Sequence, residues 1–183
     1  MSYFCVMIKH QSQFPVYILV LISLISCDIK SGRNLKSAKS NALIDYYVHV
    51  VKISDGDTFI GLTTDNKRIR FRMQGIDAPE KTQAFSKRST EKLSELIFDK
   101  TVGIDVHTSS DRYGRPVVYV YTPEGMDVGA EMLKSGMAWH YKYYDNSKFY
   151  SDLEHTARKK KTGLWKDKNP VPPWEFRKIK RKK

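Results

Sequence analysis

The chain has 183 residues, 40% of them hydrophobic, and a formal net charge of +12 at pH 7. This hydrophobic content excludes a chain that is disordered throughout and fits one domain with additional terminal segments. The excess of Lys and Arg indicates a polyanionic partner, either a nucleic acid or an anionic membrane surface.

An uncharged apolar run, FPVYILVLISLIS, occupies residues 14–26 and follows Lys9. It is shorter than the ~20 residues of a membrane-spanning helix and is typical of a secretion signal. The run ends in Leu-Ile-Ser-Cys, which resembles a bacterial lipoprotein signal. We therefore expect a signal peptide over residues 1–26 and a lipidated Cys27 as the mature N-terminus. An uncleaved anchor and an ordinary secretory signal are the alternatives.

The expected location is extracytoplasmic, either as a cell-envelope lipoprotein held to a membrane by its lipid or as a secreted protein. The cysteines are Cys5 and Cys27, so under this interpretation no disulfide forms in the domain. Residues 27–42 are polar and predict a flexible tether, and the folded domain is expected over residues 43–168. No protein partner is predicted, and a monomer is expected.

Five segments carry the alternating or β-branched patterns of strands. Arg68, Arg70 and Arg72, for example, alternate with Ile69, Phe71 and Met73. The predicted strands cover residues 46–53, 58–64, 67–73, 101–108 and 116–122.

Three helices are predicted from apolar spacing and end signals. The first lies within residues 83–99, and the second runs from a cap at Asp127 to Ser135. The third carries Tyr150, Leu153 and Ala157 on one face and ends at Gly163. Five short strands with a helix between the third and fourth predict an α+β, mainly β fold: a five-stranded OB-fold barrel with three helices. Residues 169–183, which are Pro-rich and then basic, are expected to form a disordered tail.

Two acidic clusters interrupt this basic chain. Asp57 stands in "SDGDT" before the second strand, and Asp77 and Glu80 stand in "GIDAPE" after the third. An Asp-Gly pair alone is a common turn signal. Two aspartates without His or Cys suit a hard cation with oxygen ligands, Ca²⁺ or Mg²⁺ in preference to Zn²⁺.

Phosphodiester cleavage needs a cation or guanidinium to offset phosphoryl charge and a carboxylate to orient or deprotonate water. Arg72 and Arg115 could supply the guanidinium groups, and Glu80 the carboxylate. A solvated strand face would equally explain Arg72, and a plain hairpin would explain "DRYGR" at residues 111–115. Their combination in this order argues against chance.

Four motifs, "DGDT", "FRMQGIDAPE", "DRYGR" and "ARKKKTGLW", closely resemble the staphylococcal nuclease family over residues 44–168. "NPVPPWEFRK" resembles the ending of many bacterial members. The resemblance implies a Ca²⁺-dependent endonuclease on an OB-fold, which hydrolyses DNA and RNA with low sequence specificity and leaves 3′-phosphate ends. Mg²⁺ is the second choice of metal.

The resemblance also implies residue roles. Asp57, Asp77 and the carbonyl of Ala78 would bind Ca²⁺, and Glu80 would hold the attacking water. Arg72 and Arg115 would clamp the scissile phosphate. The predicted substrate contacts are Arg112, Tyr113, Tyr141 and Tyr143, of which one of the last two would stack on a base. The alternative function is a non-catalytic nucleic-acid-binding OB-fold module. Its binding of nucleic acid through Lys and Arg would survive chelation of the metal, whereas cleavage would not.

Overall fold

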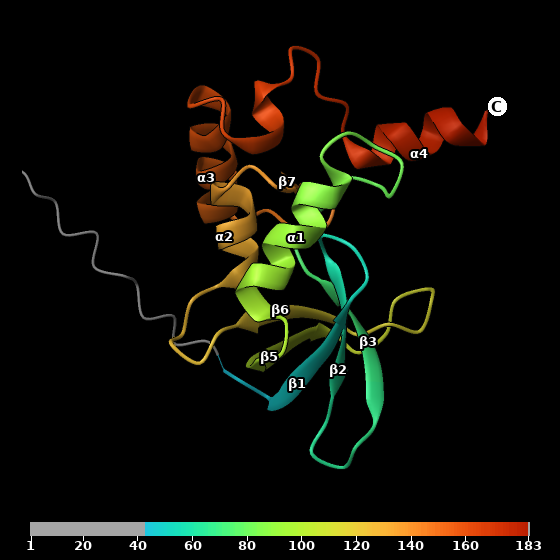
Figure 1. Ribbon diagram of the computed structural model, residues 1–183, viewed down its shortest axis with the longest axis vertical. Coiled ribbons are helices and arrows are strands. Elements are labelled where there is room, and N and C mark those ends of the chain that lie inside the picture. The colour runs from blue at the N-terminus through green and yellow to red at the C-terminus, as the bar shows by residue number, and fades with distance from the viewer. Residues whose placement is uncertain (1–42, 183) are drawn as a thin grey trace, which may run out of the picture. The chain divides into compact units, whose positions relative to one another are not determined.

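The computed structural model describes residues 43–182, and the predicted signal, tether and lipidation site lie outside them. Five strands form a closed barrel in the order β1-β2-β3-β6-β5, with α1, α2 and α3 at one end (Figure 1). The barrel strands are β1 (Tyr46–Ile53), β2 (Thr58–Leu62), β3 (Arg68–Met73), β5 (Thr101–Thr108) and β6 (Val117–Tyr121). This confirms the predicted five-stranded OB-fold barrel.

The barrel closes through two pairings between segments distant in sequence. β1 pairs antiparallel with β5, in register from Tyr46 opposite Ile104. β3 pairs with β6 in parallel, with Arg72 opposite Val117 and Met73 opposite Val118. Since this parallel seam lies where the predicted arginines stand, barrel closure itself helps to position the site.

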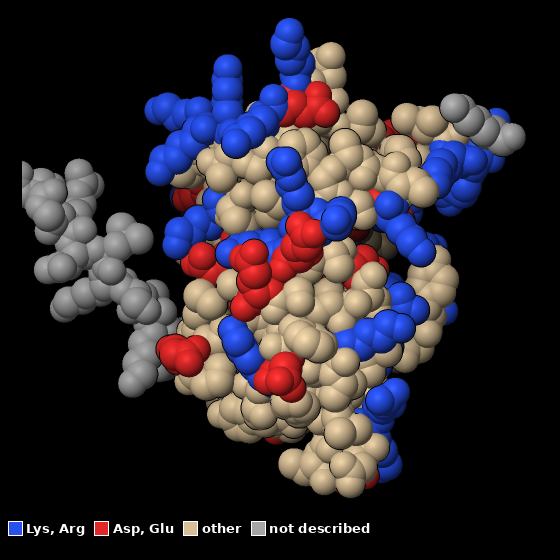
Figure 2. Space-filling model, in the orientation of Figure 1, with Lys and Arg blue, Asp and Glu red and all other residues tan. Residues whose placement is uncertain are grey.

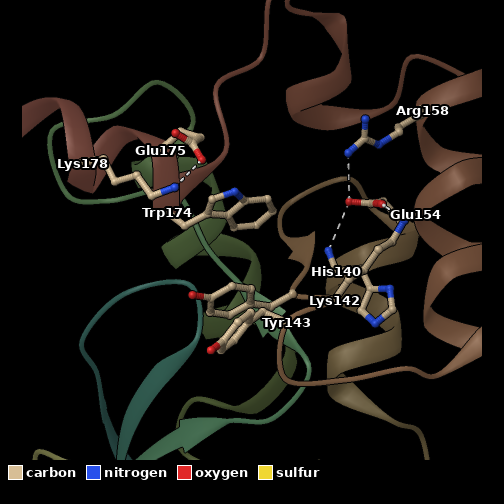
Figure 3. A pocket seen from close by; sticks show the side chains of 9 residues that line it. His140, Lys142, Tyr143, Glu154, Arg158, Trp174, Glu175 and Lys178 are labelled. Atoms are coloured by element: carbon tan, nitrogen blue, oxygen red, sulfur yellow. Dashed lines mark hydrogen bonds and ion pairs between the residues drawn. The ribbon is translucent and has the colours of Figure 1, made fainter.

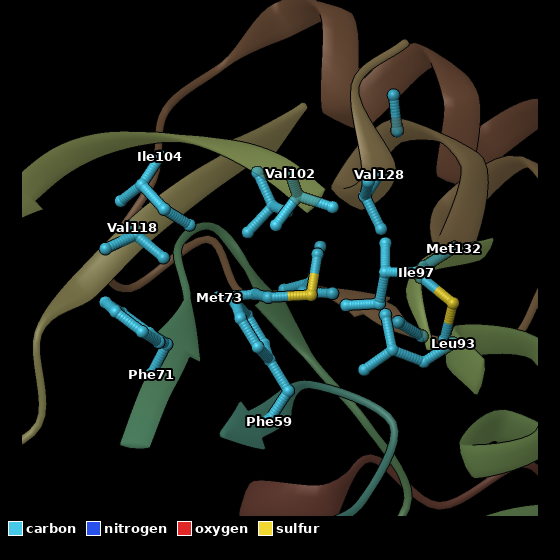
Figure 4. Packing of buried hydrophobic residues seen from close by; sticks show 14 of the residues in the cluster. Phe59, Phe71, Met73, Leu93, Ile97, Val102, Ile104, Val118, Val128 and Met132 are labelled. Atoms are coloured by element: carbon cyan, nitrogen blue, oxygen red, sulfur yellow. The ribbon is translucent and has the colours of Figure 1, made fainter. Parts of the chain in front are cut away.

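The apolar side chains that alternate along the strands point into the barrel and form its core (Figure 4). Phe59 and Phe71 come from neighbouring strands, and their rings stack with centroids 5.2 Å apart. α1 (Ser86–Ile97) covers this interior with Leu93 and Ile97, both fully buried. Burial of the apolar stripe of α1 explains its position over one end of the barrel.

α1 begins at Ser86 and not at Gln83, because Phe85 has a left-handed backbone with φ of 66°. α2 (Val128–Lys134) confirms the predicted cap, as the Asp127 side chain accepts a hydrogen bond from the Ala130 amide at 3.0 Å. Tyr150 of α3 (Lys148–Lys159) donates its hydroxyl hydrogen to the same carboxylate, at 2.9 Å. This bond joins the cap of α2 to the buried Tyr150 of α3.

The predicted end of the third helix is wrong. α3 ends at Lys159, four residues before Gly163, and Lys161 takes the left-handed turn with φ of 50°. Gly163 instead opens a short 3₁₀ helix, η1 (Gly163–Lys166), where a Cβ would lie 2.3 Å from the Gly136 carbonyl oxygen. The close approach of two backbones, and not helix termination, requires glycine there.

The predicted disordered tail contains a fourth helix, α4 (Pro173–Arg181), which begins with proline in its first turn. Figure 1 shows α4 beside the loop that follows β4 (Ile76–Asp77). β4 pairs with β7 (Trp139–His140) in a small second sheet that the sequence patterns did not indicate. Within residues 43–182, no helix is long and apolar enough to cross a membrane.

Candidate active site

A cavity of about 820 Å³ opens at the ends of β2 and β3. All but one of the residues assigned above to catalysis, metal binding and substrate contact line it; the exception is Tyr143. The lining includes Asp57, Arg72, Asp77, Ala78, Glu80, Arg112, Tyr113, Arg115 and Tyr141. The fold therefore brings together residues from four separate segments of the chain.

Asp57 reaches the cavity from a tight turn before β2. The Asp57 amide donates to the Asp55 carboxylate at 3.1 Å, and the Ser54 amide donates to the Thr58 carbonyl at 2.9 Å. The Asp57 side chain, in turn, accepts from the Ala78 amide at 2.6 Å. The first acidic cluster is thus a turn and also a connection to the second acidic cluster.

Arg72 joins the two buried aspartates. Its NH1 lies 3.1 Å from Asp57 Oδ2, and its NH2 lies 3.0 Å from Asp77 Oδ1. Only 6% of Asp57 and 2% of Asp77 is exposed to solvent. Buried carboxylates are costly without a partner, so Arg72 cannot be a residue of a merely solvated strand face.

The acidic groups of the cavity repel one another. Burial raises the pKa of Asp77 to about 6, and the charge of Asp57 adds to the rise, against hydrogen bonds from Arg177. Burial also raises the pKa of Asp55 to about 7, again with a contribution from Asp57. A hard divalent cation would relieve this repulsion, and carboxylate oxygens are the ligands that it prefers. The donor set therefore fits the implied metal, although the described residues contain no group of three or more His, Cys, Asp or Glu side chains in a metal-binding arrangement.

Arg115 is held in place by its own turn. Its Nε and NH2 donate to Asp111 Oδ2 at 2.9 and 2.7 Å. Arg112 and Arg115 both lie over the ring of Tyr113, at 4.9 and 5.3 Å from its centroid. Since Tyr113 is 67% exposed, these three side chains form a cationic and aromatic rim on the cavity.

The residue that the sequence prediction missed is Arg177 of α4. Its NH1 lies 2.7 Å from Glu80 Oε1, and its NH2 lies 2.8 Å from Asp77 Oδ2. Burial lowers the pKa of Arg177, but the bonds to Asp77 and Glu80 outweigh it and raise that pKa above its ordinary value. The signal that could have found Arg177 is "NPVPPWEFRK", which resembles the ending of bacterial family members but whose composition predicts a disordered tail.

The aromatic residues after β7 divide between two cavities. Tyr144 lines the large one, Tyr143 lines a neighbouring cavity of about 540 Å³ between α3 and α4, and Tyr141 lines both (Figure 3). The Tyr141 ring stacks on Trp174 of α4, with centroids 5.2 Å apart and planes 1° from parallel. Tyr143 is 81% exposed, more than the neighbouring Tyr144 at 61%, so its ring is accessible from solvent.

The chain is similar in sequence to proteins named as nucleases. Residues 70–167 match the family described as "Staphylococcal nuclease homologue". A protein of Haemophilus influenzae named "Uncharacterized endonuclease" is 44% identical over 128 residues, which cover 70% of this chain and 71% of that protein. The "Micrococcal nuclease" of Shigella flexneri is 37% identical over 147 residues, covering 74% and 83% of the two chains.

An Escherichia coli O157:H7 protein named "Uncharacterized endonuclease" is 41% identical over 133 residues, 73% of this chain and 86% of that one. The barrel, the paired aspartates with their bridging arginine and these relatives agree on one class of protein, the OB-fold nucleases. This chain belongs to the staphylococcal nuclease family.

Proposed function

We propose that this protein is a Ca²⁺-dependent endonuclease that hydrolyses phosphodiester bonds of DNA and RNA with low sequence specificity and leaves 3′-phosphate ends. The observation that carries the proposal is Arg72 joined to both Asp57 and Asp77, in one cavity with Glu80 and Arg115. Family membership and relatives named as nucleases support the nuclease activity.

Asp57 and Asp77 would hold the cation, together with the backbone carbonyl of Ala78. A bound Ca²⁺ would offset negative charge that develops on the phosphoryl oxygens. Mg²⁺ is the less favoured alternative: one or two carboxylates with a substrate phosphate can also bind it, but the resemblance to the family implies Ca²⁺.

Glu80 is the proposed water-orienting carboxylate. It lies three residues after Asp77, and its amide donates to the Gln83 side chain at 3.1 Å, which fixes the loop backbone. With its side chain 38% exposed, Glu80 can reach a solvent molecule while its neighbour Asp77 stays buried. A carboxylate in this position can take a proton from the attacking water.

Arg72 and Arg115 are the proposed phosphate-binding groups. Each is already held by a carboxylate, so its guanidinium enters the complex with little loss of conformational freedom. Arg112 and Tyr113 extend the contact along the backbone of the substrate, and Tyr143 offers a ring to an unpaired base. These contacts read charge and stacking, which accounts for low sequence specificity.

The competing function is a nucleic-acid-binding module without catalysis. The complete set of Asp57, Asp77, Glu80, Arg72 and Arg115 around one cavity favours the enzyme. A binding module needs only the basic rim. Two buried carboxylates close together destabilise the fold by mutual repulsion, and binding of nucleic acid does not require them.

The test is cleavage of plasmid DNA and of RNA by the full chain in Ca²⁺, in Mg²⁺ and in EDTA. We expect digestion in Ca²⁺ and none in EDTA. The Glu80→Gln and Arg72→Ala substitutions should each reduce the rate of digestion by about two orders of magnitude or more. Circular dichroism checks that the variants are folded. Retention of DNA without digestion in any metal would establish the binding module instead.

We also propose that the protein acts outside the cytoplasm, as an envelope protein held by lipid at Cys27. The support is the apolar run and the Leu-Ile-Ser-Cys sequence at its end. An extracytoplasmic nuclease would act on nucleic acid outside the cytoplasm of the cell that produces it.

A further inference from the structure

Arg177 binds the carboxylate of Asp77, which is one of the proposed ligands of the metal cation. Asp77 Oδ1 accepts from Arg72 NH2 at 3.0 Å and from Arg177 NH1 at 3.2 Å, while Oδ2 accepts from Arg177 NH2 at 2.8 Å. Both oxygens of a proposed metal ligand are therefore engaged by guanidinium groups. A cation bound to Asp77 would compete with Arg177 for the charge of this carboxylate and repel the guanidinium.

The net charge of the cluster also favours release of Arg177 when a divalent cation binds. The ion-paired cluster contains three carboxylates, of Asp57, Asp77 and Glu80, against the guanidiniums of Arg72 and Arg177. It carries an excess of negative charge, which a divalent cation would turn into an excess of positive charge. Arg177 would then gain more from an anion than from carboxylates that the cation already neutralises.

The substrate phosphate would be that anion, because Arg177 lies beside the other proposed phosphate-binding groups. Its side chain is 38% exposed and lines the same cavity as Arg72, Arg112 and Arg115, the groups that meet the substrate. A long flexible stem lets a guanidinium change partners without movement of the helix, and its fork fits phosphate as well as carboxylate.

The helix that carries Arg177 is fixed to the catalytic loop by other contacts. Lys180 Nζ donates to Thr82 Oγ1, and Gln83 Nε2 donates to the Val171 carbonyl, both at 2.5 Å. Trp174 anchors the start of α4 through its rings' contacts with Tyr141 and Trp139. Figure 2 shows Lys and Arg gathered over the C-terminal ends of α3 and α4 on this face, so this part of the surface favours a polyanion.

We propose that Arg177 is a third phosphate-binding arginine, which pairs with Asp77 and Glu80 in the metal-free protein and passes to the substrate phosphate when the cation binds. The C-terminal helix is then a part of the active site. This proposal rests on the proposed nuclease function, since it needs both the cation and the phosphodiester in the cavity.

The experiment compares the full-length wild type with Arg177→Ala and Arg177→Lys in two binding measurements. Calorimetry measures Ca²⁺ affinity without nucleic acid, and fluorescence anisotropy measures affinity for a short single-stranded phosphorothioate oligonucleotide in Ca²⁺. We expect Arg177→Ala to tighten Ca²⁺ binding and to weaken oligonucleotide binding, each by roughly tenfold, the effect of one charge-assisted hydrogen bond. Arg177→Lys keeps the charge without the fork and should fall between.

Arg181→Ala is the matched control, because Arg181 is an exposed arginine at the end of the same helix. It should leave Ca²⁺ affinity unchanged and lower oligonucleotide affinity far less than Arg177→Ala does, and thermal unfolding checks the fold of every variant. Weakening of both affinities by Arg177→Ala would make Arg177 a structural residue, and tightening of both would make it a simple blocker; either overturns the proposal. Failure of the wild type to cleave would instead refute the nuclease, whatever the two affinities show.

Discussion

Asp111 holds Arg115 in a fixed orientation through two hydrogen bonds to one carboxylate oxygen, at 2.9 Å from Nε and 2.7 Å from NH2. The other oxygen of Asp111 accepts from the backbone amides of Tyr113 and Arg115, at 2.8 and 3.0 Å. One side chain thus shapes the turn and orients the arginine that the turn carries.

Asp111→Asn should reduce cleavage by about tenfold or more, because a neutral amide holds the guanidinium more weakly than a carboxylate does. The measurement is kcat and KM on DNA in Ca²⁺. Asp65→Asn is the control, since Asp65 also pairs with a basic residue, Lys67, at 2.6 Å but lines neither cavity. Equal losses in both variants would remove the orienting role of Asp111.

Stability should depend on the ionisation of Asp111. Burial works to raise its pKa, but hydrogen bonds from Arg115 and the turn backbone outweigh burial and lower the pKa below the ordinary value. The stabilisation is therefore complete above the unfolded pKa of about 4 and is lost as pH falls through the folded pKa. Urea unfolding should show Asp111→Asn less stable than wild type at pH 7, with the difference vanishing in acid.

Gly56 should tolerate no side chain. A Cβ at Gly56 would lie 1.8 Å from Ser89 Oγ and 2.8 Å from the Ala78 Cβ. Gly56→Ala must push the Asp57 turn away from Ala78, and we expect a loss of about 1–3 kcal/mol of stability together with reduced cleavage.

Gly125→Ala is the control for Gly56→Ala. Gly125 has a φ of 81° and open space around its Cβ position, so alanine strains the backbone there without displacing a neighbour. This variant should lose about 1–2 kcal/mol of stability and keep its rate. Thermal unfolding and initial cleavage rates separate the two effects, and an unimpaired Gly56→Ala enzyme would contradict the packing argument.

Tyr143→Ala should weaken binding of single-stranded oligonucleotides by roughly 5- to 150-fold, the effect of one base–aromatic stack. Tyr143→Phe keeps the ring and should bind almost normally. Phe149→Ala is the control, because Phe149 is also an exposed aromatic residue, at 58%, but lines neither cavity. Anisotropy titrations in EDTA give the affinities without cleavage, and no difference between the two alanine variants would exclude Tyr143 from stacking.

Cys27→Ala should abolish lipid attachment. Metabolic labelling with a radioactive fatty acid would mark the wild type and leave the variant unlabelled, and the variant should leave the membrane fraction. Cys5→Ala is the matched control, since Cys5 precedes the apolar run and should be removed with the signal. Unlabelled wild-type protein would favour the uncleaved anchor or the secretory signal.

The sequence predicted the barrel well because each strand has a strong local pattern, such as the alternation through Phe71 and Met73 in β3. The two-residue strands β4 and β7 have no such pattern, as their pairing depends on the barrel having already placed them. The spacing of the motifs predicted the acidic cluster and its arginines. Arg177 could not be found in this way, because its partner Glu80 is 97 residues away and its helix has little buried surface of its own.

The parallel pairing of β3 with β6 connects local opening of the barrel to the geometry of the candidate active site. Only two residue pairs form it, and the amides of Arg72 and Gln74 donate across it to the carbonyls of Pro116 and Val118, at 2.9 and 2.8 Å. Opening of these bonds would separate the backbone of Arg72 from the chain that carries Arg115. The rate at which these two amides exchange their hydrogens for deuterium therefore measures how often the backbone of Arg72 separates from the segment that carries Arg115.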